Sequence, residues 1–246
     1  MGLVAGGGGK PREREPMTKM LVSVRNVAEA LTAAAGGADF IDLKEPRAGA
    51  LGGLPVPVIA EIVAGLRERG VVRSTSATIG DLPATDLAPI LARVHAVAAC
   101  GVDYVKVGID RSPAARALLD ALAGCGHAVV PVFIADRGLD FEQVEHACRL
   151  GFPALMVDTA DKHAGSLFDM LDASELRRFV EIARHAGIPA GLAGALRRGD
   201  LPALRSLAPD FAGFRSAVCA GDRGSELDPR RLSDLAQALR DPALVR

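Results

Sequence analysis

Three short apolar segments of the sequence, 40–43, 104–107 and 154–157, carry charged side chains within them or directly after them. An ammonium or a carboxylate gains nothing in a buried strand unless a polar site lies at the end of that strand. The three segments therefore predict one shared pocket. The charged residues that we assign to it as catalytic candidates are Asp42, Lys44, Lys106, Asp158 and Lys162.

The lysines are candidates for Schiff-base chemistry. A lysine amine with an ordinary pKa of about 10.4 is a poor nucleophile at neutral pH. Burial or a second ammonium nearby lowers that pKa, and Lys44 and Lys106 could do this for each other. An amine activated in this way can form a Schiff base with a ketone or an aldehyde. Asp42 and Asp158 would then be placed to move protons.

Each candidate also has a purely structural interpretation. Lys44 taken alone is more often a solvated loop lysine, whereas the apolar neighbours of Lys106 argue against its exposure. Asp42 and Asp158 could simply cap loops or pair with the lysines. Charges on the outer faces of the expected helices are interpreted as solvated: Glu29, Arg67, Arg177 and Arg178.

From residue 20 onward, apolar strand-like segments alternate with helix-like segments. Near-continuous apolar strands that alternate with helices indicate a parallel sheet, and eight such units match a single (β/α)8 TIM barrel. A doubly wound open sheet is the alternative, but no G-x-G-x-x-G follows the first strand. The strands are expected at 21–24, 40–43, 71–79, 104–107, 128–134, 155–157, 188–193 and 211–214. Helix N-caps are expected at Asn26, Ser112, Asp140 and Asp228.

In such a barrel the active site lies at the carboxyl ends of the strands, where Asp42 and Lys44 point to the same side. The loops after the seventh and eighth strands are typical places for phosphate, which binds to backbone N–H groups there. Gly194 and Gly221 are equally explained as turn residues, and Ser76 and Thr78 as barrel lining. The residues assigned to phosphate or substrate binding are Ser76, Thr78, Gly194, Arg215, Ser216, Gly221, Asp222 and Arg223.

Composition excludes several functional classes. Lys+Arg of 29 against Asp+Glu of 30 gives a net charge of -1, so there is no overall field to attract nucleic acid or an anionic membrane. No apolar run is long enough to span a membrane. The four cysteines form no C-x-x-C pair, which argues against a zinc site and fits a cytoplasmic protein. His127 and His163 lack partners at metal-binding spacing, so no metal is expected.

The length of 246 residues with 49% hydrophobic content suits one catalytic domain, which we place at residues 20–246. The glycine-rich, then charged, head at residues 1–19 is expected to be a disordered extension. The sequence leaves the oligomeric state open, a homo-oligomer included.

Seven motifs, taken in order along the chain, resemble the (5-formylfuran-3-yl)methyl phosphate synthase family, also called 4-(hydroxymethyl)-2-furancarboxaldehyde-phosphate synthase. Any one of them is weak, but together they cover nearly the whole fold. They are Leu-Val-Ser-Val at 21–24, Gly-Gly-Ala-Asp-Phe-Ile-Asp-Leu-Lys-Glu-Pro at 36–46, Ser-Ala-Thr-Ile-Gly-Asp at 76–81, Gly-Val-Asp-Tyr-Val-Lys-Val-Gly at 101–108, Met-Val-Asp-Thr-Ala-Asp-Lys at 156–162, Leu-Ala-Gly at 192–194 and Gly-Asp-Arg at 221–223.

The resemblance implies a TIM-barrel carbon–oxygen lyase of methanofuran biosynthesis. Such an enzyme condenses two molecules of glyceraldehyde 3-phosphate into a furan phosphate, with loss of phosphate and water and without a cofactor. By the matching motifs Lys44 would be the Schiff-base lysine, Lys106 and Asp158 further catalytic groups, and Asp42 and Lys162 assisting groups. The stretch 215–223 follows the family pattern more loosely. Two alternatives stay open: a class I aldolase acting on another phosphorylated sugar, and a non-catalytic barrel that binds phosphorylated metabolites.

Overall fold

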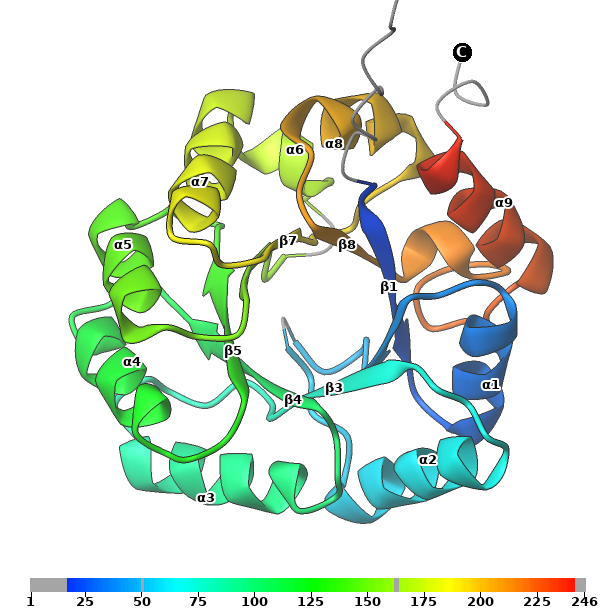
Figure 1. The fold of residues 1–246 in the computed structure, drawn as a ribbon, viewed down its shortest axis with the longest axis horizontal. Helices are drawn as coiled ribbons and strands as arrows, with labels where there is room; N and C mark the ends of the chain where they lie inside the picture. The colour runs from blue at the N-terminus through cyan, green and yellow to red at the C-terminus, as the bar shows by residue number, and fades with distance from the viewer. Residues whose placement is uncertain (1–16, 50, 162–163, 242–246) are drawn as a thin grey trace, which may run out of the picture.

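A computed structural model describes residues 17–49, 51–161 and 164–241. In this part of the chain eight parallel strands pair in sequence order, and β8 closes against β1 to form a barrel (Figure 1). The expected single (β/α)8 TIM barrel is therefore confirmed. The strands are β1 (Lys19–Val24), β2 (Phe40–Leu43), β3 (Ser74–Thr78), β4 (Tyr104–Ile109), β5 (Val129–Ile134), β6 (Leu155–Asp158), β7 (Ala190–Leu192) and β8 (Phe211–Phe214).

The helices form a ring outside the barrel (Figure 1). The expected caps at Asn26, Asp140 and Asp228 are confirmed, because each side chain accepts a hydrogen bond from a backbone N–H of the first helical turn. The helices are α1 (Val27–Ala35), α2 (Val56–Glu68), α3 (Leu87–Ala98), α4 (Ala115–Ala123), α5 (Phe141–Leu150), α6 (Leu167–Met170), α7 (Ala173–His185), α8 (Leu201–Leu207) and α9 (Pro229–Arg240), with short 3-10 turns η1 (Arg198–Asp200) and η2 (Ser216–Val218).

Some expected boundaries are wrong. Ser112 does not cap a helix, because its hydroxyl donates to Asp110 Oδ1 (2.8 Å) and α4 begins only at Ala115. The strand expected from residue 71 begins at Ser74, since the preceding Val72 is 89% exposed. At the amino-terminal end β1 already begins at Lys19, whereas residues 1–16 of the expected extension lie outside the described part.

Because side chains alternate along the strands, the barrel has one apolar layer between the strands and the helices and a second one in its interior. One face of each strand packs against the helices and forms the main core, which includes Val22, Ile41 and Val107. The other face fills the inside of the barrel with a smaller apolar cluster, which includes Leu21 and Met156. Residues two positions apart share a face of a strand. The inward faces of β2 and β6 therefore change from apolar to charged toward their carboxyl ends.

No helix within the described residues has both the length and the apolar composition that crossing a membrane requires. All four cysteines are free thiols: Cys100, Cys125, Cys148 and Cys219. They supply no covalent cross-link, so noncovalent packing between strands and helices holds the barrel together.

Candidate active site

Two lysine–carboxylate pairs are buried at the carboxyl end of the barrel. The Nζ atom of Lys106 lies 2.7 Å from Asp42 Oδ1, and the Nζ atom of Lys44 lies 3.1 Å from Asp158 Oδ2. None of the four side chains is more than slightly exposed, and Asp42 is fully buried. The sequence predicted that these four residues share one pocket, and the structure places all of them in the lining of a single cavity, which we call the lysine cavity.

Asp42 is held by hydroxyl groups from both neighbouring strands. Ser76 of β3 donates to Asp42 Oδ1 (2.6 Å), and Ser23 of β1 donates to Asp42 Oδ2 (3.2 Å). These three residues stand opposite one another in the strand register, which brings their side chains to the same level of the barrel. These hydrogen bonds satisfy both carboxylate oxygens of the buried side chain. Asp42 is thus fixed as the partner of Lys106.

The environment of Lys106 makes its ammonium easier to deprotonate than that of an ordinary lysine. Burial lowers the pKa of Lys106 below its ordinary value, the Asp42 carboxylate opposes this shift, and the positive charge of Lys44 adds to it. The sequence suggested that a second ammonium lowers the pKa of a lysine in this pocket, and Lys44 has this effect on Lys106. A buried lysine with a lowered pKa can take up a proton during a reaction near neutral pH.

Asp158 ends β6 and links Lys44 to the loop that follows. Its Oδ2 atom accepts from Lys44, and its Oδ1 atom accepts from the backbone N–H of Thr159 (2.8 Å). Asp136, at the end of the neighbouring strand, accepts from the backbone N–H of Ala160 and of Asp161. Lys162, the remaining catalytic candidate, lies outside the described residues.

The loops after β7 and β8 form the other side of the lysine cavity, and four of the residues predicted to bind phosphate line it: Gly194, Arg215, Ser216 and Arg223. Gly194 has a φ of +120°, and a Cβ atom at this position would lie 2.9 Å from Thr159 Cγ2. Only glycine fits there without strain. The close approach of this loop to Thr159 depends on that glycine.

Several residues that the sequence assigned to phosphate binding have other contacts. Ser76 donates to Asp42, and the fully buried Thr78 donates to the carbonyl oxygen of Gly52 (2.8 Å), so neither hydroxyl lines the lysine cavity. Asp222 also lies outside this lining, and accepts from the Gly224 backbone and the Ser225 hydroxyl. Gly221 does not line it either. These side chains shape the site rather than face its interior.

The two arginines of the β8 loop, Arg215 and Arg223, differ in whether their guanidinium groups are free to bind a ligand. Arg215 uses all five N–H donors of its guanidinium on protein acceptors: two on Glu29, and one each on the carbonyls of Ser23, Arg223 and Ser225. Arg223 lines the lysine cavity, and its guanidinium makes no hydrogen bond or ion pair to the residues that the structure describes. Arg223 is therefore a cation that is available to an anionic ligand in the lysine cavity.

Sequence reasoning missed the partner of Arg215. Glu29 was expected to be a solvated charge on the outside of α1, but it is buried and forms an ion pair with Arg215 (2.6 Å) and another with Arg25. The spacing of Arg25 and Glu29, four residues apart, was a signal for the second pair. Nothing local indicated the first, because Arg215 is 186 residues away in the sequence.

Within the described residues, no group of three or more His, Cys, Asp or Glu side chains is arranged to hold a metal ion. The residues that line the lysine cavity carry amines, carboxylates, hydroxyls and the guanidinium groups of Arg215 and Arg223, beside loop backbone. Such a set can bind a phosphorylated carbonyl compound, form an imine with it and move protons at the neighbouring carbon.

Comparison with known proteins relates most of the chain to one family. The model of the 4-HFC-P synthase family matches residues 20–236. A (5-formylfuran-3-yl)methyl phosphate synthase from Methanopyrus kandleri is 38% identical over 237 residues, which covers 90% of this chain and 98% of that protein. The protein of the same name from Archaeoglobus fulgidus is 36% identical over 236 residues, with coverage of 90% and 99%.

Among solved structures, phosphoribosyl anthranilate isomerase from Thermus thermophilus aligns with a TM-score of 0.62 at 17% identity, over 91% of this chain and 98% of that one. The 3-hexulose-6-phosphate synthase from Salmonella typhimurium aligns with a TM-score of 0.59 at 17% identity, over 90% and 100%. At such low identity these similarities support the barrel fold alone.

Proposed function

The chain belongs to the 4-HFC-P synthase family, the (5-formylfuran-3-yl)methyl phosphate synthases, and we propose that it makes this furan phosphate from two molecules of glyceraldehyde 3-phosphate. The product would supply the furan ring of a methanofuran-type cofactor. The observation that carries the proposal is the pair of buried lysine–carboxylate contacts that face one cavity at the carboxyl end of the barrel.

In this mechanism Lys44 is the nucleophile. Asp158, 3.1 Å from the Lys44 amine, accepts its proton, and the neutral amine attacks the aldehyde carbon of one triose. The resulting carbinolamine loses water when Asp158 returns the proton to the departing hydroxyl. The imine that forms draws electrons from the adjacent carbon, which makes a proton on that carbon acidic.

Lys106 then serves as the base at that carbon. Its lowered pKa favours the neutral amine that must accept the proton, and Asp42 stabilises the ammonium that results. The enamine expels the phosphate from the third carbon of this triose, and the enol that remains attacks the carbonyl carbon of the second triose, in its ketone isomer, through that third carbon to form the carbon–carbon bond. Lys162 would assist, as the family motif implies.

The atoms balance when the two trioses yield one furan phosphate, one inorganic phosphate and two molecules of water. A hydroxyl oxygen of the second triose closes the ring on the carbonyl carbon next to the imine, and loss of two molecules of water makes the ring aromatic. Water then hydrolyses the imine, which releases the aldehyde of the product and the Lys44 amine. One phosphate is thus retained and one leaves. Gly194, Ser216 and the guanidinium of Arg223 are the groups that we assign to phosphate.

Incubation of the purified protein with glyceraldehyde 3-phosphate tests the overall reaction. We expect a furan aldehyde chromophore, the product mass by mass spectrometry, and one inorganic phosphate released per furan formed. A six-carbon sugar bisphosphate without phosphate release would instead indicate an aldolase. No turnover at all would point to a barrel that only binds phosphorylated metabolites.

A further inference from the structure

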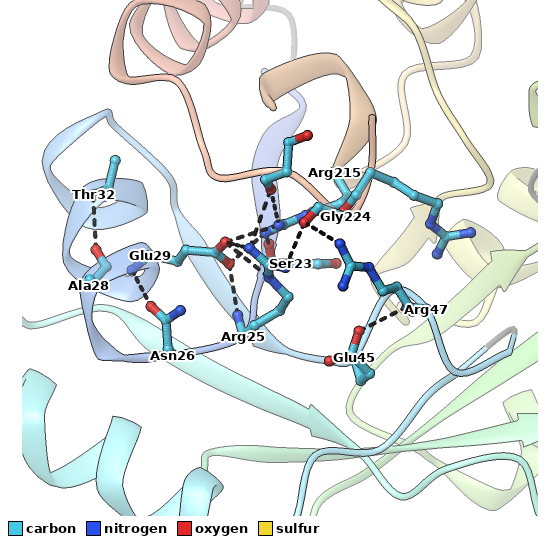
Figure 2. A network of polar contacts seen from close by, with 12 residues as sticks. Ser23, Arg25, Asn26, Ala28, Glu29, Thr32, Glu45, Arg47, Arg215 and Gly224 are labelled. Carbon is cyan, nitrogen blue, oxygen red and sulfur yellow. Dashed lines mark hydrogen bonds and ion pairs between the residues drawn. The ribbon is translucent and has the colours of Figure 1, made fainter. Parts of the chain in front are cut away.

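Three arginines bind the backbone of one short segment of the β8 loop, residues 223–225 (Figure 2). Arg215 donates to the first carbonyl oxygen of the segment (2.9 Å) and to the third (2.6 Å). Arg25 donates to the second carbonyl oxygen (2.7 Å), and Arg47 to the same atom (3.2 Å). All three consecutive carbonyls of the segment are therefore occupied by guanidinium donors.

Glu29 is the carboxylate that holds two of these arginines together. Its Oε2 atom accepts from Arg215 Nη1 (2.6 Å) and from the backbone N–H of Arg25 (2.9 Å), and its Oε1 atom accepts from both guanidinium groups. Burial alone would raise the pKa of Glu29, but the hydrogen bonds from Arg215 and Arg25 outweigh it and hold the pKa below its usual range. Glu29 is thus an anion at neutral pH.

The first residue of the held segment is Arg223, the arginine whose guanidinium is free among the described residues and lines the lysine cavity. Its carbonyl oxygen is bound by Arg215, while its side chain reaches the cavity. A fixed backbone limits the positions that a long side chain can sample. The contacts of Glu29 on α1 therefore help to determine the position of the Arg223 guanidinium in the lysine cavity.

We propose that Glu29 is a positioning residue, which acts through Arg215 and Arg25 to hold residues 223–225 so that Arg223 binds a phosphate group of the substrate. This role rests on the proposed function for the identity of the substrate, but not for the binding of phosphate. Glu29 touches no substrate, and its effect reaches the cavity only through the 223–225 backbone.

Inorganic phosphate is a suitable probe because its binding requires no turnover. We expect Glu29→Gln to weaken phosphate binding by about tenfold, since a charge-assisted hydrogen bond is lost or misaligned. The dissociation constant would be measured by calorimetry at a temperature where circular dichroism shows the variant to be folded. Glu61→Gln, on the exposed face of α2, is the matched control and should bind phosphate like the parent protein.

A double-mutant cycle separates positioning from general stability. If Glu29 acts through Arg223, then Glu29→Gln has no further effect on phosphate affinity once Arg223→Met is present. If Glu29→Gln does not fold, Arg25→Lys takes its place, since lysine keeps the charge but cannot bond both Glu29 and the second carbonyl. With glyceraldehyde 3-phosphate, the same variants should raise KM more than they lower kcat.

Additive losses in the cycle, an unchanged phosphate affinity in the folded variants, or no phosphate binding by the parent protein would each overturn the proposal. Failure of the proposed function has a different signature. In that case the parent protein binds phosphate in a manner that depends on Arg223 and Glu29, but forms no furan from glyceraldehyde 3-phosphate.

Discussion

Replacing Asp42 with asparagine is expected to destabilise the protein by an amount that depends on pH. Asp42 is fully buried, and its Oδ1 atom lies 2.7 Å from the Nζ atom of Lys106, which is 3% exposed. The substitution nearly preserves the shape of the side chain but leaves the Lys106 ammonium without this partner. Breaking a buried ion pair in this way costs about 3–5 kcal/mol of folding free energy.

The cost has an upper limit, because Lys106 can lose its proton. Neutralising a lysine costs about 1.4 kcal/mol for each pH unit below its solution pKa of about 10.4, hence roughly 4–5 kcal/mol at pH 7 and roughly 2 kcal/mol at pH 9. In the folded variant Lys106 would be neutral, whereas in the unfolded chain it is protonated. The unfolded state then binds one more proton, so the stability of the variant rises as the pH rises.

Burial already lowers the pKa of Lys106, and Asp42 opposes that shift, so removal of the carboxylate acts in the same direction as burial. Urea unfolding of the parent protein and of Asp42→Asn at pH 7 and pH 9 measures the difference. The double variant Asp42→Asn with Lys106→Met is the control, and its stability relative to the parent should lack the steep gain between the two pH values. A deficit of the same size at both pH values would refute the reasoning, because it would mean that other groups hold Lys106 in its charged form.

Three further predictions follow from the site. Lys106→Met should lower kcat by about 10²–10⁴-fold, as expected for loss of a general base, and steady-state phosphate release measures this. In the parent protein kcat/KM should fall as the pH decreases through the lowered pKa of Lys106, because the amine that accepts the proton becomes charged. If this decrease at acidic pH is unchanged in Lys106→Met, another group is responsible for it. Gly194→Ala should reduce the free energy of unfolding by about 1–3 kcal/mol, because φ is +120° and the Thr159 side chain lies in the way; equal stability in urea would show that the loop adjusts freely.

The barrel and the meeting of its buried lysines and carboxylates in one cavity were predictable from the sequence because the signals for them are local. Alternating apolar segments and N-caps such as Asn26 specify strands and helices within a few residues. The inward direction of Asp42 and Lys44 follows from the two-residue period of a strand. Once eight parallel strands close into a barrel, residues such as Lys106 and Asp158 must meet at the same end.

The arginine network was not predictable, because it depends on contacts between distant parts of the chain. A glutamate on a helix is usually exposed to solvent, so the sequence around Glu29 does not indicate its burial. Glu29 is buried because it pairs with Arg215, which is distant in the sequence. For the same reason Arg215 could not be told from Arg223 as a phosphate ligand. Ser112 followed by Pro113 has the pattern of a helix start, but its hydroxyl binds Asp110 instead.

Reduction with sodium borohydride in the presence of glyceraldehyde 3-phosphate, followed by peptide mass spectrometry, tests the central proposal most directly. We predict a triose adduct on Lys44 that is retained in Lys106→Met and absent in Lys44→Arg. An adduct on Lys106, or no adduct on a protein that still forms the furan phosphate, would contradict the assignment of Lys44 as the Schiff-base lysine.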